Sequence, residues 1–233
     1  MPVDQQYYRE VASGSTAEKL LIAARDRIFR DFIAQMQPSA SDEILDVGVS
    51  DVINDGANVL ERSYPHQHKI TACGLGEGAG FKAAFPLCRY VQIEPNTRLP
   101  FDDNAFDVAT SNAVLEHAGS HGKQVLLVKE LCRVARRVFI TVPNRYFPVE
   151  HHTAIPLAHY LDGTFRMACR IAGKSEWTDE QNLILMTRKR LLGFAALVAK
   201  SSIAKSSVPK SAAVGYTGLS LGPLSSNLYL AFR

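Results

Sequence analysis

Short apolar runs recur along the chain, and each is bounded by polar or turn-forming residues. Runs of this kind are typical of strands that are buried on both faces of a parallel sheet. The first five predicted strands lie at 44–47, 69–75, 90–93, 106–111 and 138–142. Because helix-like segments separate them, this order predicts an α/β fold with a doubly wound, mostly parallel sheet.

The segments between and around these runs carry apolar residues at helical spacing. A capping box, Ser15-Thr16-Ala17-Glu18, opens a predicted helix that ends before Pro38. Further helices are predicted at 58–64, 123–134 and 191–200.

The alternation of strands and helices breaks after Asn144. Residues 145–180 carry prolines, histidines and an apolar stretch, and they predict an insertion that caps the sheet after the fifth strand. Two more predicted strands, at 202–208 and 227–232, complete a seven-stranded sheet. We therefore expect a single domain over residues 1–233, with an N-terminal arm and helix at 1–40.

Composition and charge are those of an ordinary globular protein. The chain has 26 basic and 23 acidic side chains, a net charge of +3 and 46% hydrophobic residues. This balance predicts no nucleic-acid partner, and no apolar run reaches the ~18 residues of a membrane span. The four cysteines form no Cys-x-x-Cys pair and the N-terminus shows no signal peptide, so we expect a cytoplasmic protein with free thiols.

Two of the predicted strands end in polar groups. The first strand leads into Asp46-Val47-Gly48, and the fourth leads into a segment that runs from Asn112 to His117. A Leu99-Pro100-Phe101 turn precedes the fourth strand. Since open α/β sheets bind ligands at the carboxyl ends of their strands, these polar groups predict a ligand site.

These segments resemble the class I S-adenosylmethionine-dependent methyltransferases, in particular a small bacterial "type 11" group. The resemblance covers about residues 44–161 and is most specific in its middle. It implies a Rossmann-like methyltransferase fold, S-adenosylmethionine as the cofactor, and methyl transfer as the activity. The segment 143–153 resembles one subset of these enzymes in particular, the methyltransferases found alongside polysaccharide-building glycosyltransferases.

The resemblance places the cofactor on the turn after the first strand, where a glycine lets the backbone approach a ligand. Ser50 and Val52 stand where the family has two further glycines. The methionine end of the cofactor would meet the end of the fourth strand. The cofactor residues implied in these two segments are Asp46, Gly48, Val49, Ser50, Asn112 and Ala113.

Carboxylates complete the implied cofactor set. In the family, an acid after the second strand takes both ribose hydroxyls; Glu77 is the candidate here, with a solvated loop glutamate as the alternative. After the third strand, Glu94 or Asn96 would accept from the adenine amino group. The run Gly74-x-Gly76-x-x-Ala79 imitates a dinucleotide fingerprint, but it follows the second strand and opens no long helix.

A polar cluster follows the fifth strand. We expect the catalytic base to be His117, Glu150 or His152, because these residues lie just beyond the fourth and fifth strands. Arg145 and His151 are expected to bind the substrate, Arg145 through an anionic group. A structural cluster is the alternative. No metal site is expected, because neighbouring histidines point apart in an extended chain and the family uses no metal.

These features favour methyl transfer to a small-molecule or carbohydrate-type acceptor. The alternative is a catalytically inactive methyltransferase-like binding or scaffold protein. A nicotinamide-dependent reductase is a further alternative, but it would need a glycine fingerprint at the first strand, and Asp46-Val47-Gly48-Val49-Ser50 lacks one. The methylated atom and the oligomeric state are left open.

Overall fold

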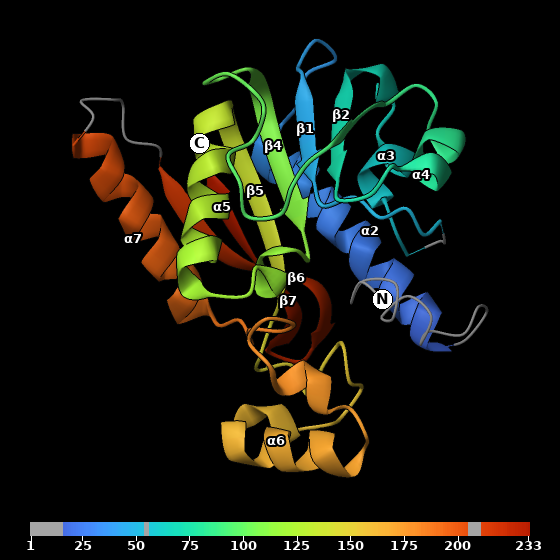
Figure 1. Ribbon diagram of the computed structural model, residues 1–233, viewed down its shortest axis with the longest axis vertical. Helices are drawn as coiled ribbons and strands as arrows, with labels where there is room; N and C mark the ends of the chain where they lie inside the picture. The colour runs from blue at the N-terminus through green and yellow to red at the C-terminus, as the bar shows by residue number, and fades with distance from the viewer. Residues whose placement is uncertain (1–15, 54–55, 205–210) are drawn as a thin grey trace.

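A seven-stranded sheet forms the centre of the computed structural model, which describes residues 16–53, 56–204 and 211–233 (Figure 1). The strands lie in the order β3-β2-β1-β4-β5-β7-β6, and the first five pair with one another in parallel. These five are β1 (Ile44–Val47), β2 (Ile70–Gly74), β3 (Arg89–Gln92), β4 (Phe106–Asn112) and β5 (Ala135–Pro143). The predicted seven-stranded, mostly parallel sheet is therefore confirmed.

The last two strands form an antiparallel hairpin at one side of the sheet. β6 (Ala212–Leu221) pairs with β7 (Leu224–Phe232), and β7 pairs antiparallel with β5. The prediction of a strand at 202–208 was wrong at its start, because the helix α7 (Arg188–Ala204) runs through it; residues 205–210 lie outside the described residues. The α7 sequence contains no proline, and its only glycine lies near the start, so nothing stops the helix before residue 204.

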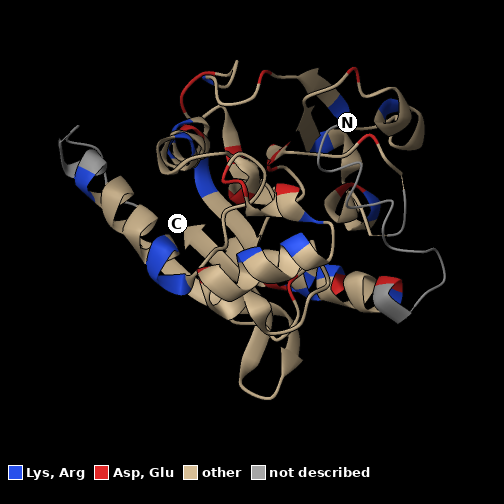
Figure 2. Cartoon of the chain, turned by 60° about the horizontal axis from the view of Figure 1, so that its bottom comes forward, with Lys and Arg blue, Asp and Glu red and all other residues tan. Residues whose placement is uncertain are grey.

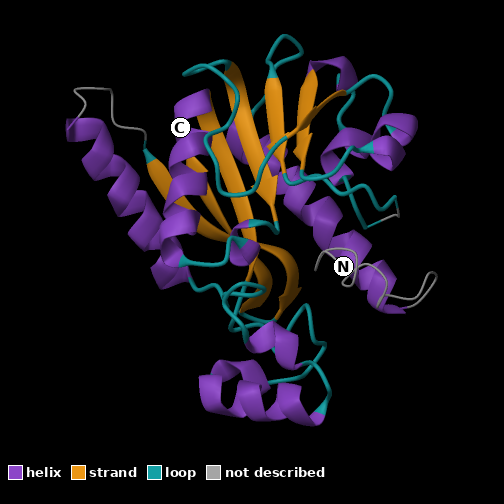
Figure 3. Cartoon of the chain, in the orientation of Figure 1, coloured by secondary structure: helices purple, strands orange, loops and turns teal. Residues whose placement is uncertain are grey.

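Helices cover both faces of the sheet (Figure 3). On one face lie α2 (Thr16–Met36) and α3 (Val59–Ser63), and on the other lie α5 (His121–Val134) and α7. Successive strand residues point to opposite faces, so Ile44 packs with the α2 face and Leu45 with the α5 face. The remaining helix beside the sheet, α4 (Ala79–Ala84), has six residues, too few for the helix of a dinucleotide fingerprint.

The residues after β5 leave the sheet and build the predicted capping insertion. It contains the 3-10 helices η3 (Ala158–Tyr160) and η4 (Ser175–Thr178) and the helix α6 (Asp162–Ile171). Phe165, Cys169 and Trp177 are buried in a small core of its own. In Figure 1 the insertion lies below the sheet, at the edge where β4 and β5 end.

No helix in the described part of the chain is long and apolar enough to cross a membrane. Figure 2 shows basic and acidic segments spread over several elements. The N-terminal arm and Ser15 of the capping box lie outside the described residues, although α2 begins at Thr16, as expected.

Candidate active site

The turn after β1 is built around a glycine in the left-handed region. Gly48 has φ of +103°, and the backbone N–H groups of Gly48 and Val49 both donate to the Cys73 carbonyl, at 2.8 and 3.0 Å. A Cβ at position 48 would lie 2.2 Å from Cγ2 of Val114. The glycine is therefore required by the fold itself, a reason that the sequence pattern did not reveal.

Ser50 belongs to a loop that is fixed by a side-chain amide. Its N–H donates to Asn58 Oδ1 at 2.9 Å, and Asn58 Nδ2 donates back to the Ser50 carbonyl at 2.8 Å. The Ser50 hydroxyl also accepts from the Val52 N–H at 3.1 Å. These contacts hold the loop without the two family glycines that Ser50 and Val52 replace.

A small cavity lies beside this turn, on the α2 face of the sheet. Asp46 lines it, and burial raises the pKa of the Asp46 carboxyl to about 7 against the opposing effects of Glu61 and Arg25. The volume of the cavity is about 50 Å³, whereas pockets for small organic ligands measure ~300–1,000 Å³. The cavity is therefore too small to enclose a whole nucleoside. The predicted cofactor residues that line the cavity are Asp46, Gly48, Val49, Ser50 and Asn112.

The carboxyl ends of β2 and β3 present the two predicted carboxylates. Glu77 follows β2 and Glu94 follows β3; both are exposed, as is Asn96. Since β1, β2 and β3 are parallel neighbours, these carboxylates and Gly48 lie along one edge of the sheet. Carboxylates are good acceptors for paired ribose hydroxyls and for an adenine amino group, so this set of acceptors fits S-adenosylmethionine.

The end of β4 is a strained turn. Ala113 has φ of +57°, which is costly for a residue with a Cβ. Its N–H donates to the Thr141 carbonyl at 3.0 Å, and Thr141 Oγ1 donates to Asn112 Oδ1 at 2.5 Å. Through these contacts β5 holds the turn, and the turn brings Val114 over Gly48.

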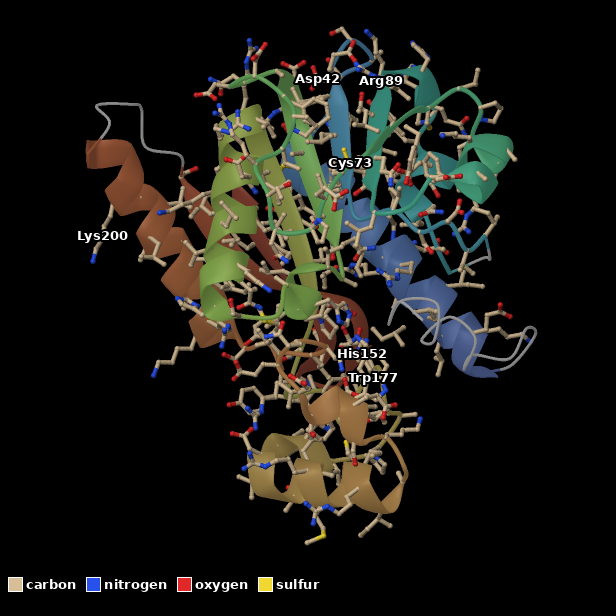
Figure 4. The ribbon with its side chains drawn as sticks, viewed as in Figure 1. Asp42, Cys73, Arg89, His152, Trp177 and Lys200 are labelled. Carbon is tan, nitrogen blue, oxygen red and sulfur yellow. The ribbon has the colours of Figure 1, made fainter. Side chains whose placement is uncertain are left out.

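Beyond β4 and β5, three of the predicted residues form a hydrogen-bonded chain. His152 Nδ1 lies 2.8 Å from Glu150 Oε1, and His152 Nε2 lies 3.2 Å from His117 Nε2. His117 Nδ1 in turn lies 2.6 Å from the Asn182 carbonyl. Trp177 covers the pair, with ring centroids 4.9 Å from His152 and 6.4 Å from His117 (Figure 4).

Glu150 is saturated with hydrogen bonds. Its carboxylate accepts from His152 Nδ1, from the N–H groups of His152 and Thr153, and from the Thr153 hydroxyl. Burial alone would raise its pKa, but the neighbouring His152 and these donors hold the pKa of Glu150 far below its ordinary value. Glu150 is therefore ionised and orients His152, which makes it a poor proton acceptor.

The two predicted substrate-binding residues have internal partners. Arg145 donates to the carbonyls of His159 and Tyr160, at 3.0 and 3.2 Å, and pairs with Asp162 at 2.5 Å. It thereby ties the end of β5 to the insertion. The His151 ring lies beside the ring of Phe147, with centroids 6.0 Å apart, and burial lowers the pKa of His151 to about 4. Anion binding by Arg145 must compete with these structural contacts.

Three residues of this cluster escaped the sequence prediction of site residues. Glu116 is fully buried, both of its carboxylate oxygens lack a hydrogen-bond partner among the described residues, and burial raises its pKa to about 7. Trp177 and Asn182 come from the far side of the insertion. Glu116 stood beside a candidate histidine, which was a usable signal, but nothing local distinguished Trp177 or Asn182.

Residues 71–138 match a family model described as a methyltransferase domain. Over these residues the chain is similar to methyltransferase domains, which supports the predicted enzyme class and its S-adenosylmethionine cofactor. No curated protein matches the chain.

Solved structures with the same fold are distant in sequence. The methyltransferase domain of bacterial CtHen1 is 16% identical, with a TM-score of 0.56 over 91% of this chain and 98% of that one. A Thermotoga maritima protein described as a possible histamine N-methyltransferase is 11% identical, with a TM-score of 0.54 over 99% and 97% of the two chains. Magnesium protoporphyrin IX methyltransferase from Synechocystis, solved with S-adenosylhomocysteine, is 10% identical, with a TM-score of 0.59 over 98% and 93%. These similarities confirm the Rossmann-like methyltransferase fold.

Proposed function

We propose that the enzyme methylates a hydroxyl group of a small-molecule or carbohydrate-type acceptor in the cytoplasm. The observation that supports this most directly is the buried chain Glu150–His152–His117. It lies beyond the ends of β4 and β5, close in sequence to Asn112 and Ala113, where the methionine end of the cofactor is expected. A histidine held in this way is suited to handle a proton at neutral pH.

Bound S-adenosylmethionine would supply an electrophilic methyl group to the acceptor oxygen and would leave as S-adenosylhomocysteine. The His152–His117 pair would take the hydroxyl proton. Alignment of the reactants can account for about 7–11 kcal/mol of barrier lowering. Glu150 contributes to this alignment because its hydrogen bond fixes the ring of His152.

The residues proposed to bind the cofactor lie along the edge of the sheet where β1 to β4 end. Asp46, Gly48, Val49 and Ser50 are proposed to hold the cofactor after β1, and Asn112 and Ala113 after β4. Glu77 is proposed to accept from the ribose hydroxyls, and Glu94 or Asn96 from the adenine amino group. Their common edge and the exposure of the two glutamates support this arrangement.

The proposed class of acceptor is based on the segment after β5. The run from Pro143 to Thr153 supports a carbohydrate-type acceptor through its resemblance to methyltransferases found with polysaccharide-building enzymes. The structural neighbours do not select an acceptor, because one is described as a possible histamine N-methyltransferase and another as a magnesium protoporphyrin IX methyltransferase.

Calorimetric titration with S-adenosylhomocysteine tests the cofactor site. We expect a micromolar Kd, which is a binding free energy of about −8 kcal/mol. For Glu77→Gln we expect a Kd at least tenfold higher. Asp102→Asn, an exposed change before β4, is the matched control and should leave the Kd unchanged. If the wild-type chain releases no heat with saturating ligand, the scaffold alternative replaces the enzyme. Turnover with saccharide and nucleotide-sugar acceptors then tests the acceptor class.

A further inference from the structure

Three side chains of types that can bind a metal ion meet beside Trp177. A carboxylate oxygen of Glu116 and ring nitrogens of His117 and His152 lie within 4.8 Å of one another. Glu116 and His117 come from the 3-10 helix η2 (Leu115–His117) after β4, whereas His152 comes from the segment after β5. In Figure 4, His152 and Trp177 lie where the sheet meets the insertion.

The hydrogen bonds of the two rings determine which nitrogen of each faces the cluster. A carbonyl oxygen only accepts, so His117 Nδ1 donates to Asn182. The Glu150 carboxylate accepts from two backbone N–H groups and the Thr153 hydroxyl, and as an acceptor toward His152 as well it requires a hydrogen on His152 Nδ1. In neutral rings, both Nε2 atoms then present lone pairs to each other across 3.2 Å. This arrangement needs a positive centre between or beside the two nitrogens.

Glu116 supplies a second, independent reason for a cation. Its side chain is fully buried, and both of its oxygens lack hydrogen-bond partners among the described residues. Leaving a buried polar group unpaired is costly, and for an ionised carboxylate the cost is larger still. A single proton shared by the histidines would satisfy the rings but would leave Glu116 without a direct partner.

The outer contacts match those of metal-bound histidines. Such histidines donate their second ring N–H to a carboxylate or a backbone carbonyl, and here Glu150 and the Asn182 carbonyl fill these two roles. Two nitrogens bound to a tetrahedral zinc ion at ~2.0–2.1 Å lie about 3.3–3.4 Å apart. The observed Nε2–Nε2 distance of 3.2 Å is close to that value.

We propose that Glu116, His117 and His152 bind a divalent first-row transition-metal ion, with a further coordination position open to water or acceptor. Imidazole ligands favour ions such as Zn²⁺ over Mg²⁺ or Ca²⁺. The proposal departs from the expectation of a metal-free site, which rested on the family's lack of a metal and on the neighbouring pair His151 and His152. It rests on the proposed function and revises its proton step. With both Nε2 atoms on the ion, the histidines hold the ion rather than accept the proton, and an acceptor hydroxyl bound to the ion would be acidic enough to lose its proton to water.

The test uses the untagged chain of 233 residues, stripped of metal with a chelator and titrated with Co²⁺. We expect one equivalent per chain, the visible absorption of a low-coordinate Co²⁺ site, and displacement of that signal by Zn²⁺. Glu116→Gln nearly preserves the shape of the buried side chain and should weaken binding at least tenfold. His68→Ala, an exposed histidine in the 3-10 helix η1 (Gln67–Lys69), is the matched control and should bind like wild type.

A change outside the ligand set separates this site from a surface site. Glu150→Gln removes the charge that orients His152 and should cost about 10–100-fold in Co²⁺ affinity. Absence of the Co²⁺ signal in the wild-type chain would overturn the proposal, as would binding that neither Glu116→Gln nor Glu150→Gln alters. The S-adenosylhomocysteine titration is run on the metal-free chain, so failure of the cofactor site and failure of the metal site are observed separately.

Discussion

Val114 lies directly over Gly48, so that any side chain at position 48 would meet Cγ2 of Val114 at 2.2 Å. The contact joins the turns that follow β1 and β4, the two neighbouring strands at the centre of the sheet. It also changes how a substitution at Gly48 must be interpreted, because lost cofactor binding and lost packing would occur together.

Gly48→Ala is expected to lower the free energy of unfolding by about 1–3 kcal/mol, because the residue must keep a positive φ. Urea denaturation measures this. The double variant with Val114→Ala should recover part of the loss, since the steric conflict is then relieved while the backbone strain remains. If Gly48→Ala is as stable as wild type, the turn has another conformation.

Much of the fold was predictable because buried strands leave a local signal. β1 was predicted at its observed bounds, and β2 to β4 within one residue at each end, since apolar runs mark them directly. β6 was misplaced because a short window over 202–208 does not distinguish a strand from a continuing helix. The candidate histidines were found because they follow strand ends. The partners that determine their chemistry, Trp177 and Asn182, approach through the insertion, and no local pattern encodes that contact.

The ion pair between Asp42 and Arg137 gives the stability a defined pH dependence. Burial alone would raise the pKa of Asp42, but hydrogen bonds from Ser39 and the Arg137 guanidinium lower it overall. A lowered pKa means that the native state favours the ionised form. The contribution is therefore complete above the unfolded-state pKa of about 3.9 and is lost as the pH falls through the native pKa.

Asp42→Asn should accordingly lower the free energy of unfolding by about 1.5–3 kcal/mol at pH 7. Urea titrations at pH 7 and near pH 3 should show this difference shrinking as the acid is neutralised. Asp102→Asn, which is exposed, serves as the control and should show little effect at either pH. A deficit that is equally large at both values would mean that Asp42 acts through packing.

Arg145 is expected to hold the insertion against the sheet. Arg145→Gln removes its bonds to the His159 and Tyr160 carbonyls and its pair with Asp162. Hydrogen exchange followed by mass spectrometry should then show faster exchange over 158–171, with the sheet unchanged. Arg166→Gln, on the exposed side of α6, should exchange like wild type. Unchanged exchange in Arg145→Gln would return Arg145 to its predicted role in binding an anion.

The last prediction separates cofactor binding from catalysis at the histidine chain. His152→Ala and Glu150→Gln should each leave the affinity for S-adenosylhomocysteine within about threefold, because neither side chain is assigned to the cofactor. Turnover of the true acceptor should fall by roughly 10²-fold or more in at least one variant, since the proton can no longer be handled by an oriented ring. His117→Ala completes the set, with His68→Ala as the control. Normal turnover in all three variants would make the cluster structural, and catalysis would then rest on alignment of the acceptor and the methyl group alone.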